Sequence, residues 1–168
     1  MLNNLKEPIC KVKWLPRPDF YDQDTTSKNK MVTIGQIGGE DCLFFCYQNY
    51  CSHFSQNKRC LFCNLVSTSK TYNSVLKKKD IEDIGEVARA AFMDNNVNHV
   101  FLTGGCFNHQ KENELVSEIL ESIRKHTGLT RIPGTILPSP AKSKDEIQRY
   151  YDSGIQALGF SMEIWDEK

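Results

Sequence analysis

The sequence has no excess of charge of either sign and no long apolar run. Its 168 residues contain 21 Lys and Arg against 21 Asp and Glu, and these charges are spread along the chain. Basic patches that bind nucleic acid or an anionic membrane surface are therefore not expected. No stretch approaches the roughly 18 apolar residues of a membrane span, and the N-terminus lacks the basic and apolar segments of a secretory signal. We expect a soluble cytoplasmic protein with no nucleic-acid or membrane partner.

A framework of paired cysteines is also missing. The seven cysteines are an odd number in a chain without an export signal, which argues against disulfides and favours metal binding or catalysis. They are Cys10, Cys42, Cys46, Cys51, Cys60, Cys63 and Cys106. Cys42 and Cys46 fall on one face of a predicted strand, where we expect them to pack in the core as small apolar side chains.

Length and composition indicate one domain. With 39% apolar residues, a chain of this size can bury one sizeable core. Residues 1–30 carry Pro8, Pro16, Pro18 and a polar run without periodicity, so we expect a loosely structured lead-in there. The predicted domain spans residues 31–168.

Strands and helices alternate within this domain. β-prone residues on both sides of Gly38-Gly39-Glu40-Asp41 predict a hairpin over 31–37 and 42–47. Apolar residues at helical spacing predict helices over 80–95, 112–126 and 143–154, with Asp80 and Ser143 as N-terminal caps of the first and third and Gly128 as the C-terminal cap of the second. Short apolar runs predict strands over 99–103, 131–137 and 157–165. This order favours an α/β fold of right-handed βαβ units, with active-site groups at the carboxyl ends of parallel strands.

The loop after residue 47 carries the strongest chemical signal. Cys51, Cys60 and Cys63 form a Cys-x8-Cys-x2-Cys pattern directly after a predicted strand. Thiolates are the soft ligands that iron-sulfur clusters need, and three of them hold three irons of a [4Fe-4S] cubane while the fourth iron stays open. Cys46 competes with Cys51 for the place of first ligand. Cys51 is favoured because it lies past the apolar run, in the loop.

A structural zinc site is the main alternative, since Cys-x2-Cys is also the knuckle of zinc ribbons and His53 or Cys46 can supply further ligands. The sequence has no second Cys-x2-Cys pair and no His-x3-5-His pair, and Cys106 follows a different predicted strand. The absence of a second pair of zinc ligands favours the cluster over a zinc-stabilised binding module. A third possibility is a scaffold without catalysis that keeps the cluster for electron transfer.

The cysteine pattern resembles the signature of the radical S-adenosylmethionine (SAM) superfamily, Cys-x3-Cys-x2-Cys after the first strand of a partial (βα)6 barrel. Phe62 stands at the aromatic position before the last cysteine, and the first gap is expanded to eight residues. The run Thr103-Gly104-Gly105-Cys106 stands where the family has a Gly-Gly-Glu motif whose backbone receives the SAM amino group. Here a cysteine replaces the glutamate. An ordinary strand-to-helix turn is the other explanation of the two glycines.

The resemblance implies a parallel-stranded partial (βα) barrel over roughly residues 42–168, with about four of the six βα units of the family, preceded by the hairpin. It implies a [4Fe-4S] cluster and SAM as cofactors, with Ser139 and Glu163 as further SAM contacts at the third and fourth strands. A solvent-facing position is the alternative for Glu163. Because two of the six βα units of the family barrel are not found in the sequence, the chain looks truncated. We expect a partner chain or a further C-terminal part to cover the exposed edge of the last strand.

The activity implied by this resemblance is reductive cleavage of SAM to methionine and a 5'-deoxyadenosyl radical. That radical abstracts a hydrogen atom from a substrate that the sequence does not identify, and the cofactor supplies the difficult chemistry. A low-potential electron donor, ferredoxin or flavodoxin, is the implied partner.

Overall fold

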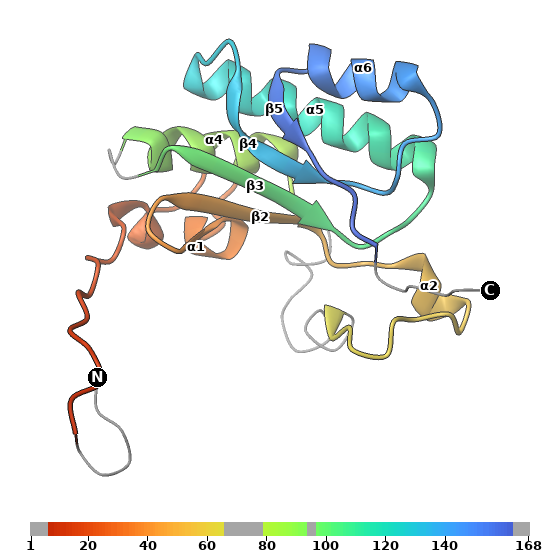
Figure 1. The fold of residues 1–168 in the computed structure, drawn as a ribbon. Coiled ribbons are helices and arrows are strands. Elements are labelled where there is room, and N and C mark those ends of the chain that lie inside the picture. Colours follow the sequence, from red (N-terminus) through yellow and green to blue (C-terminus); the bar gives the residue numbers. More distant parts are fainter. Residues whose placement is uncertain (1–6, 66–78, 94–96, 163–168) are drawn as a thin grey trace.

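The protein is described by a computed structural model that covers residues 7–65, 79–93 and 97–162 (Figure 1). One sheet of five strands runs through these residues in the order β1-β2-β3-β4-β5. The strands are β1 (Gln36–Gly38), β2 (Cys42–Gln48), β3 (His99–Gly104), β4 (Ile132–Leu137) and β5 (Ile155–Leu158). β1 is antiparallel to β2, and β2 to β5 are parallel neighbours. The predicted hairpin and the mostly parallel α/β sheet are therefore confirmed.

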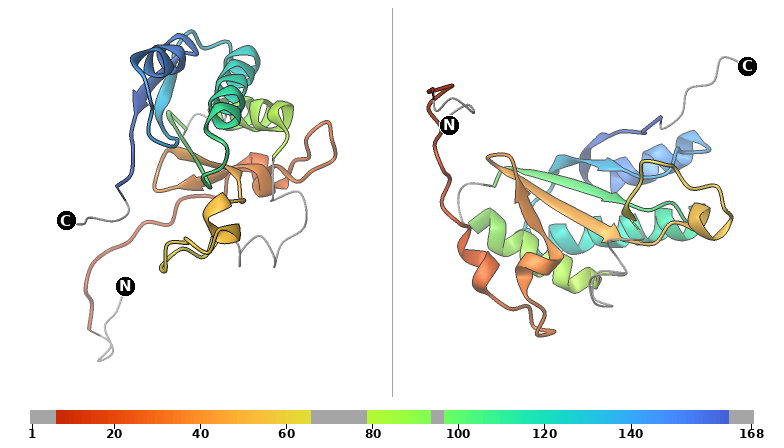
Figure 2. Two further views of the ribbon diagram at one scale, coloured as in Figure 1. Left: turned by 90° about the vertical axis from the view of Figure 1, so that its right-hand side faces the viewer. Right: turned by 90° about the horizontal axis from the view of Figure 1, so that it is seen from below.

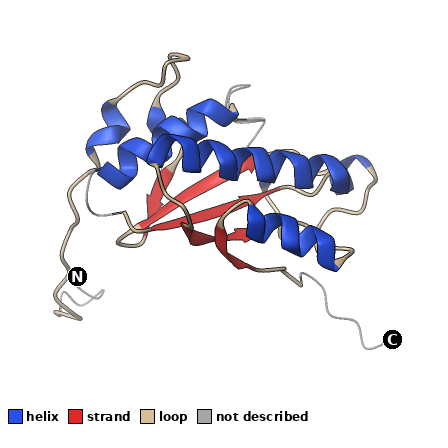
Figure 3. Cartoon of the chain, turned by 90° about the horizontal axis from the view of Figure 1, so that it is seen from above, coloured by secondary structure: helices blue, strands red, loops and turns tan. Residues whose placement is uncertain are grey.

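Three long helices lie on one side of this sheet. They are α4 (Ile81–Met93), α5 (His109–Thr127) and α6 (Lys144–Asp152), which connect consecutive parallel strands (Figures 2 and 3). Helices on one side are what successive crossovers of the same hand produce. Shorter helical turns are η1 (Asp19–Asp22), α1 (Met31–Ile34) and α2 (Ser52–Ser55). Among the described residues, no helix is long and apolar enough to cross a membrane.

The core lies between the sheet and the three long helices. Alternate residues of β2, β3 and β4, such as Phe45, are buried, and so is the apolar stripe of α5, which includes Ile119. Burying one such side chain contributes about 1.5–3 kcal/mol relative to leaving it exposed. Gly85 of α4 lets α5 approach closely, because a Cβ atom there would stand 2.4 Å from side-chain atoms of both His126 and Ser122.

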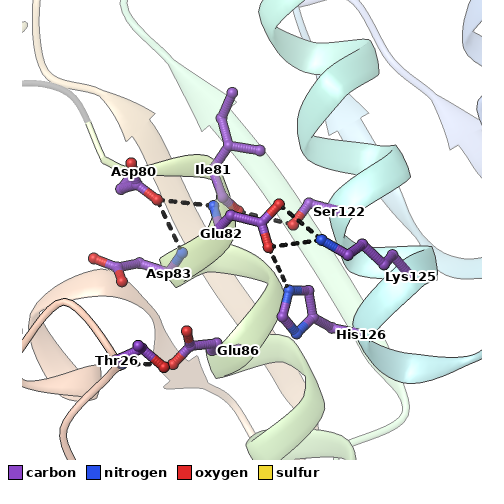
Figure 4. Close-up of polar contacts among 9 residues, drawn as sticks. All are labelled: Thr26, Asp80, Ile81, Glu82, Asp83, Glu86, Ser122, Lys125 and His126. Carbon is purple, nitrogen blue, oxygen red and sulfur yellow. Dashed lines mark hydrogen bonds and ion pairs between the residues drawn. The ribbon is translucent and has the colours of Figure 1, made fainter.

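Polar contacts hold the first turn of α4 against α5 (Figure 4). Asp80 caps the helix, with its Oδ1 accepting from the N–H groups of Glu82 and Asp83 at 2.9 and 3.3 Å. The Glu82 carboxylate lies 3.1 Å from Lys125 Nζ and 2.9 Å from His126 Nε2. The capping role predicted for Asp80 is thus confirmed, and it coincides with a contact between two helices.

Part of the segment expected to be a loose lead-in packs on the domain. Phe20 of η1 is only 1% exposed and joins the core. Asn29 Nδ2 donates to Oδ2 of the buried Asp83 at 2.8 Å, and the N–H of Thr26 donates to Glu86 at 2.8 Å. The buried Phe20 side chain and the hydrogen bond to the buried carboxylate of Asp83 therefore order this part of the N-terminal segment.

The first arm of the hairpin is shorter than predicted. Residues 31–34 form the helical turn α1, and only Gln36–Gly38 pair with β2. Met31 and Ile34 are buried, and α1 packs against η1 and α4. Tertiary packing has overridden the β preference of this stretch, as it commonly does.

Helix ends follow capping chemistry. α5 begins at His109 rather than at the expected Glu112, because the Asn108 side chain accepts from the N–H of Lys111 and caps the helix there. Gly128 ends α5 with φ of 73°, as predicted. The Ser143 cap of α6 is also confirmed.

The last strand is displaced relative to the expectation. β5 covers Ile155–Leu158, whereas the sequence predicted a strand over 157–165. Gly154, with φ of 100°, makes the turn from α6 directly into the strand. Glu163, the predicted SAM contact on this strand, lies outside the described residues.

The side of the sheet turned away from the long helices is partly exposed, and we call it the open face. It carries alternate residues of β2 and β3, namely Cys42, Phe44, Cys46, His99, Phe101 and Thr103. The rings of Phe44 and Phe101 lie 4.8 Å apart between centroids. Cys42 and Cys46 share a face as predicted, but they are half-buried on this open face and not packed in the core.

Candidate functional site

The three cysteines of the predicted cluster motif lie at the carboxyl ends of the parallel strands. β2 ends at Gln48, and the cysteine loop (residues 49–65) lies beyond the ends of β2 and β3, with α2 inside it (Figure 1). Cys51 is 9% exposed, whereas Cys60 and Cys63 are half-buried. This is the edge where ligands of open parallel sheets bind.

Main-chain hydrogen bonds attach the cysteine loop to the residues that follow β3. The N–H of Gly105 donates to the Gln48 carbonyl at 2.9 Å, and the N–H of Ser52 donates to the Cys106 carbonyl at 2.7 Å. Ser52 Oγ donates to the same carbonyl at 3.2 Å. Cys51 and Cys106 are therefore brought together, although 54 positions separate Ser52 from Cys106 in the sequence.

The two glycines that follow Thr103 make room for atoms of the protein. A Cβ on Gly104 would lie 2.5 Å from the Tyr47 ring, and a Cβ on Gly105 would lie 2.1 Å from the Tyr50 carbonyl oxygen. Thr103 itself is half-buried on the open face, opposite Cys46 in the register of β2 and β3. The sequence predicted these glycines as main-chain contacts of SAM; in the structure, the space that their side chains would fill is taken by Tyr47 and Tyr50.

The thiol of Cys106 stands among other polar groups of this edge. Burial raises its pKa above the ordinary value, and so do the nearby Cys51, Glu112 and Cys60 when they carry negative charge. A hydrogen bond from the Ser139 side chain acts in the opposite direction. Ser139, predicted as a contact of SAM, contacts Cys106 in this structure.

A buried carboxylate beside this thiol was missed by the sequence analysis. Glu112 is 2% exposed, and its Oε1 accepts from the Tyr47 hydroxyl at 2.9 Å and from the N–H of Ser139 at 3.2 Å. Its Oε2 is buried without a hydrogen-bond partner in the described part of the chain. An acidic residue in the first turn of a helix usually lies at the surface, where it interacts favourably with the positive end of the helix dipole. The sequence therefore does not indicate that Glu112 is buried.

Cys46, the competing first ligand, has partners of its own. Its thiol donates to Asn49 Oδ1 at 2.6 Å, and the ammonium group of Lys79 donates to its carbonyl oxygen. Burial raises the pKa of the Cys46 thiol, whereas the positive charge of Lys79 lowers it. Lys79 is only 4% exposed, and desolvation lowers the pKa of its ammonium group. Cys51, by contrast, lies in the loop beside Cys106.

The donor set has the chemistry of a soft metal site, although the sulfurs are dispersed in this structure. Cys60 and Cys63 are joined by a tight turn, with the N–H of Cys63 donating to the Cys60 carbonyl at 3.1 Å. Within residues 7–65, 79–93 and 97–162, no three His, Cys, Asp or Glu side chains converge closely enough to hold a metal ion. Phe62, the predicted aromatic neighbour of a cofactor, is 70% exposed. Metal binding therefore requires the cysteine loop to change conformation so that its sulfur atoms come closer together.

Comparison with known proteins tests whether this arrangement has a recognised relative. The chain has no significant match to a protein-family model, to a curated protein or to a solved structure.

Proposed function

We propose that this chain binds a [4Fe-4S] cluster through Cys51, Cys60 and Cys63 and acts as a radical SAM enzyme. The observation that supports it most directly is the attachment of the cysteine loop to the end of β3. The Ser52 to Cys106 hydrogen bond places Cys51 beside the glycine-containing turn at the carboxyl edge of a parallel sheet. A proposed cluster ligand and the backbone proposed to receive SAM are thereby neighbours.

Other features of the fold agree with this proposal. The three long helices leave the open face uncovered by any long helix in the described residues, and Thr103 lies on that face next to the cysteine loop. We assign Gly104 and Gly105 as main-chain contacts of SAM, with Thr103, Phe62, Ser139 and Glu163 around it. The cluster would supply the electron that cleaves SAM and generates the 5'-deoxyadenosyl radical, while the chain orients SAM and excludes water. Ferredoxin or flavodoxin is the proposed electron donor.

The seven thiols support a reducing compartment for this function. None of the seven, all of which lie in the described ranges, forms a disulfide. Cytosolic reductants keep thiols in this state, which the assembly of an iron-sulfur cluster on cysteine requires. A cytoplasmic location is therefore part of the proposal.

A second candidate function is a zinc-stabilised module, and one structural observation favours it. The sequence suggested His53 or Cys46 as a further ligand, and the fold brings Cys106 to the cysteine loop as well. Cys51, Cys60, Cys63 and Cys106 together would make the four-thiolate set that structural zinc sites use.

Metal analysis separates the two functions. The full chain, purified without oxygen, is analysed for iron, sulfide and zinc, next to Cys60→Ala and the control Cys42→Ala. Cys42 lies at the amino end of β2, away from the loop, so its replacement should leave metal content unchanged. About four irons and four sulfides, lost only in Cys60→Ala, would support the cluster. Zinc without sulfide would contradict it and support the second candidate.

Catalysis needs its own measurement after the metal has been identified. Reduction of the cluster-loaded chain with dithionite in the presence of SAM should release methionine and 5'-deoxyadenosine. A chain that holds the cluster but leaves SAM intact under these conditions would be an electron-transfer scaffold rather than an enzyme.

A further inference from the structure

The amino ends of α5 and α6 meet at the carboxyl edge of the sheet. α5 begins after β3 ends and α6 begins after β4 ends, so both helices start at this edge (Figure 1). His109 Nε2 and Glu146 Oε2 lie 2.8 Å apart and join the two helix ends. These two residues line a pocket with a volume of about 520 Å³. The amino end of a helix favours an anion, but a ligand site needs further evidence.

The spacing of residues along both helices brings other polar side chains to this pocket. On α5, Asn113 follows His109 by four positions, which places the two on one face of the helix. On α6, Arg149 follows Glu146 by three positions and shares its face, and Lys142 stands just before the helix begins. All five residues line the pocket. Side chains from two distant segments therefore face one cavity.

The buried amide of Asn113 is the observation that indicates a ligand. Asn113 is only 3% exposed, and its Oδ1 accepts from the Tyr150 hydroxyl. This bond fixes the orientation of the amide, and Nδ2 has no acceptor in the part of the chain that the structure describes. Buried polar side chains are nearly always hydrogen-bonded. An acceptor atom of a ligand in the pocket would satisfy this donor.

The first main-chain N–H groups of α5 are additional donors. The Asn108 carbonyl accepts from the N–H of Glu112, and the Asn108 side chain accepts from the N–H of Lys111. Among the described residues, the N–H groups of His109 and Gln110 have no acceptor. Such groups at the start of a helix lack an intrahelical partner and suit the oxygens of an anion.

Two cationic side chains determine the charge of the pocket. Within the described ranges, neither Lys142 nor Arg149 forms a side-chain hydrogen bond or a salt bridge. Glu146 is the single carboxylate among the lining residues. Its Oε2 is already engaged, because it accepts from the N–H of Lys142 at 2.6 Å and contacts His109. The two cations therefore outnumber the carboxylate and remain available to a ligand.

We propose that this pocket binds the phosphate group of a small phosphorylated molecule. The three terminal oxygens of a phosphate monoester match the donors offered by the N–H groups of His109 and Gln110 and by Asn113 Nδ2. Lys142 and Arg149 match its two negative charges. A carboxylate has two oxygens and one charge, so it would leave part of this donor set unused. The inference goes beyond the proposed function and does not depend on the metal of the cysteine loop.

NMR titration of the full chain with inorganic phosphate tests this site. At constant ionic strength, phosphate should shift the main-chain amide signals of His109 and Gln110 and the side-chain amide signal of Asn113 along one saturable curve. Acetate serves as the carboxylate probe. It should need a concentration at least about tenfold higher for the same shifts, which is the factor that corresponds to the loss of one hydrogen bond to a charged group.

Variants of the lining residues provide a second measurement. Lys142→Gln and Arg149→Gln should each weaken phosphate binding by about tenfold. Lys144→Gln is the matched control, because it removes a lysine charge from the first turn of α6 but Lys144 does not line the pocket. Asn113→Asp keeps an acceptor for Tyr150 and replaces the donor by an oxygen, so it should abolish phosphate binding. Circular dichroism verifies that each variant is folded.

Each outcome supports or overturns the inference. Shifts that do not saturate, or that are absent at His109 and Gln110, overturn the site. Equal weakening in Lys142→Gln and Lys144→Gln shows attraction by general charge and also overturns it. Acetate that binds as tightly as phosphate overturns the assignment to phosphate. A chain that lacks iron but passes these tests would contradict the proposed function and leave this inference standing, and a cluster-loaded chain that fails them would do the reverse.

Discussion

The main-chain N–H of Ser52 donates a 2.7 Å hydrogen bond to the carbonyl oxygen of Cys106. This bond joins the residue that follows Cys51, the first predicted cluster ligand, to the residue that follows Gly104-Gly105. It makes the cysteine loop and the turn after β3 one structural unit, so changes on either side should affect metal binding.

Ser52→Pro should detach the cysteine loop with little damage to the rest of the domain. Proline lacks the N–H that donates to Cys106, yet it suits this position, because Ser52 opens α2 and Cys51 before it is extended, with φ of −135° and ψ of 123°. We expect the metal content to fall and the free energy of unfolding to drop by about 1 kcal/mol, the usual net value of one hydrogen bond. Metal analysis and urea unfolding measure the two effects.

Ser52→Ala is the matched control for this prediction. It removes only the Oγ bond and keeps the N–H. Metal content close to that of the wild-type protein in Ser52→Ala, with loss in Ser52→Pro, assigns the effect to the main-chain bond. Equal loss in both variants would contradict that assignment.

Gly105→Ala should disturb the same unit from the side of β3. The new Cβ would stand 2.1 Å from the Tyr50 carbonyl oxygen, and a main-chain atom cannot move aside as a flexible side chain can. Overpacking of this kind costs about 1–3 kcal/mol. The urea midpoint should fall, and so should the metal content. Gly39→Asn is the control, since its turn has open space and φ of 68°, which Asn tolerates; a similar loss there would contradict the packing argument.

Replacement of Glu112 tests the buried polar group next to Cys106. Glu112→Leu leaves the Tyr47 hydroxyl and the Ser139 N–H without their acceptor, so we expect a loss of about 1–3 kcal/mol in the free energy of unfolding. Glu112→Gln keeps a carbonyl oxygen and should lose less. If Tyr47→Phe abolishes the difference between the two variants, the effect comes from the Tyr47 hydrogen bond; an unchanged difference would assign it to Ser139 or to packing.

Stability should decrease in acid partly through Glu82. A hydrogen bond from His126 and one from Lys125 hold the pKa of this carboxyl below its usual 4.5 (Figure 4). A carboxyl with a lowered folded-state pKa stabilises the fold above the unfolded-state value, and this contribution disappears as the pH falls through the folded-state value. The urea midpoint of Glu82→Gln should therefore change less between pH 6 and pH 3 than that of the wild-type protein.

The control for this pH effect is Glu118→Gln, an exposed carboxylate on α5. It should keep the wild-type pH dependence. If Glu82→Gln and the wild-type protein lose stability in parallel below pH 4.5, the contacts of Glu82 with α5 do not contribute to folding.

The local pattern of residues determined most of the fold in advance. Apolar spacing and the caps at Asp80, Ser143 and Gly128 define α4, α5 and α6, because capping and amphipathic periodicity act within one helix. Their alternation with short apolar runs sufficed to predict the parallel sheet. The position of the cysteine loop at its carboxyl edge followed from the same alternation.

Contacts between distant segments were decided by the tertiary structure. Gln48 pairs with Gly104 in the register of β2 and β3, and this register sets Cys106 beside Cys51. The burial of Glu112 and Lys79 arises likewise from neighbours on other elements. A sequence pattern reports what a residue prefers locally, whereas strand register and helix packing determine which groups meet, and the thiols and carboxylate of the proposed site meet only through that packing.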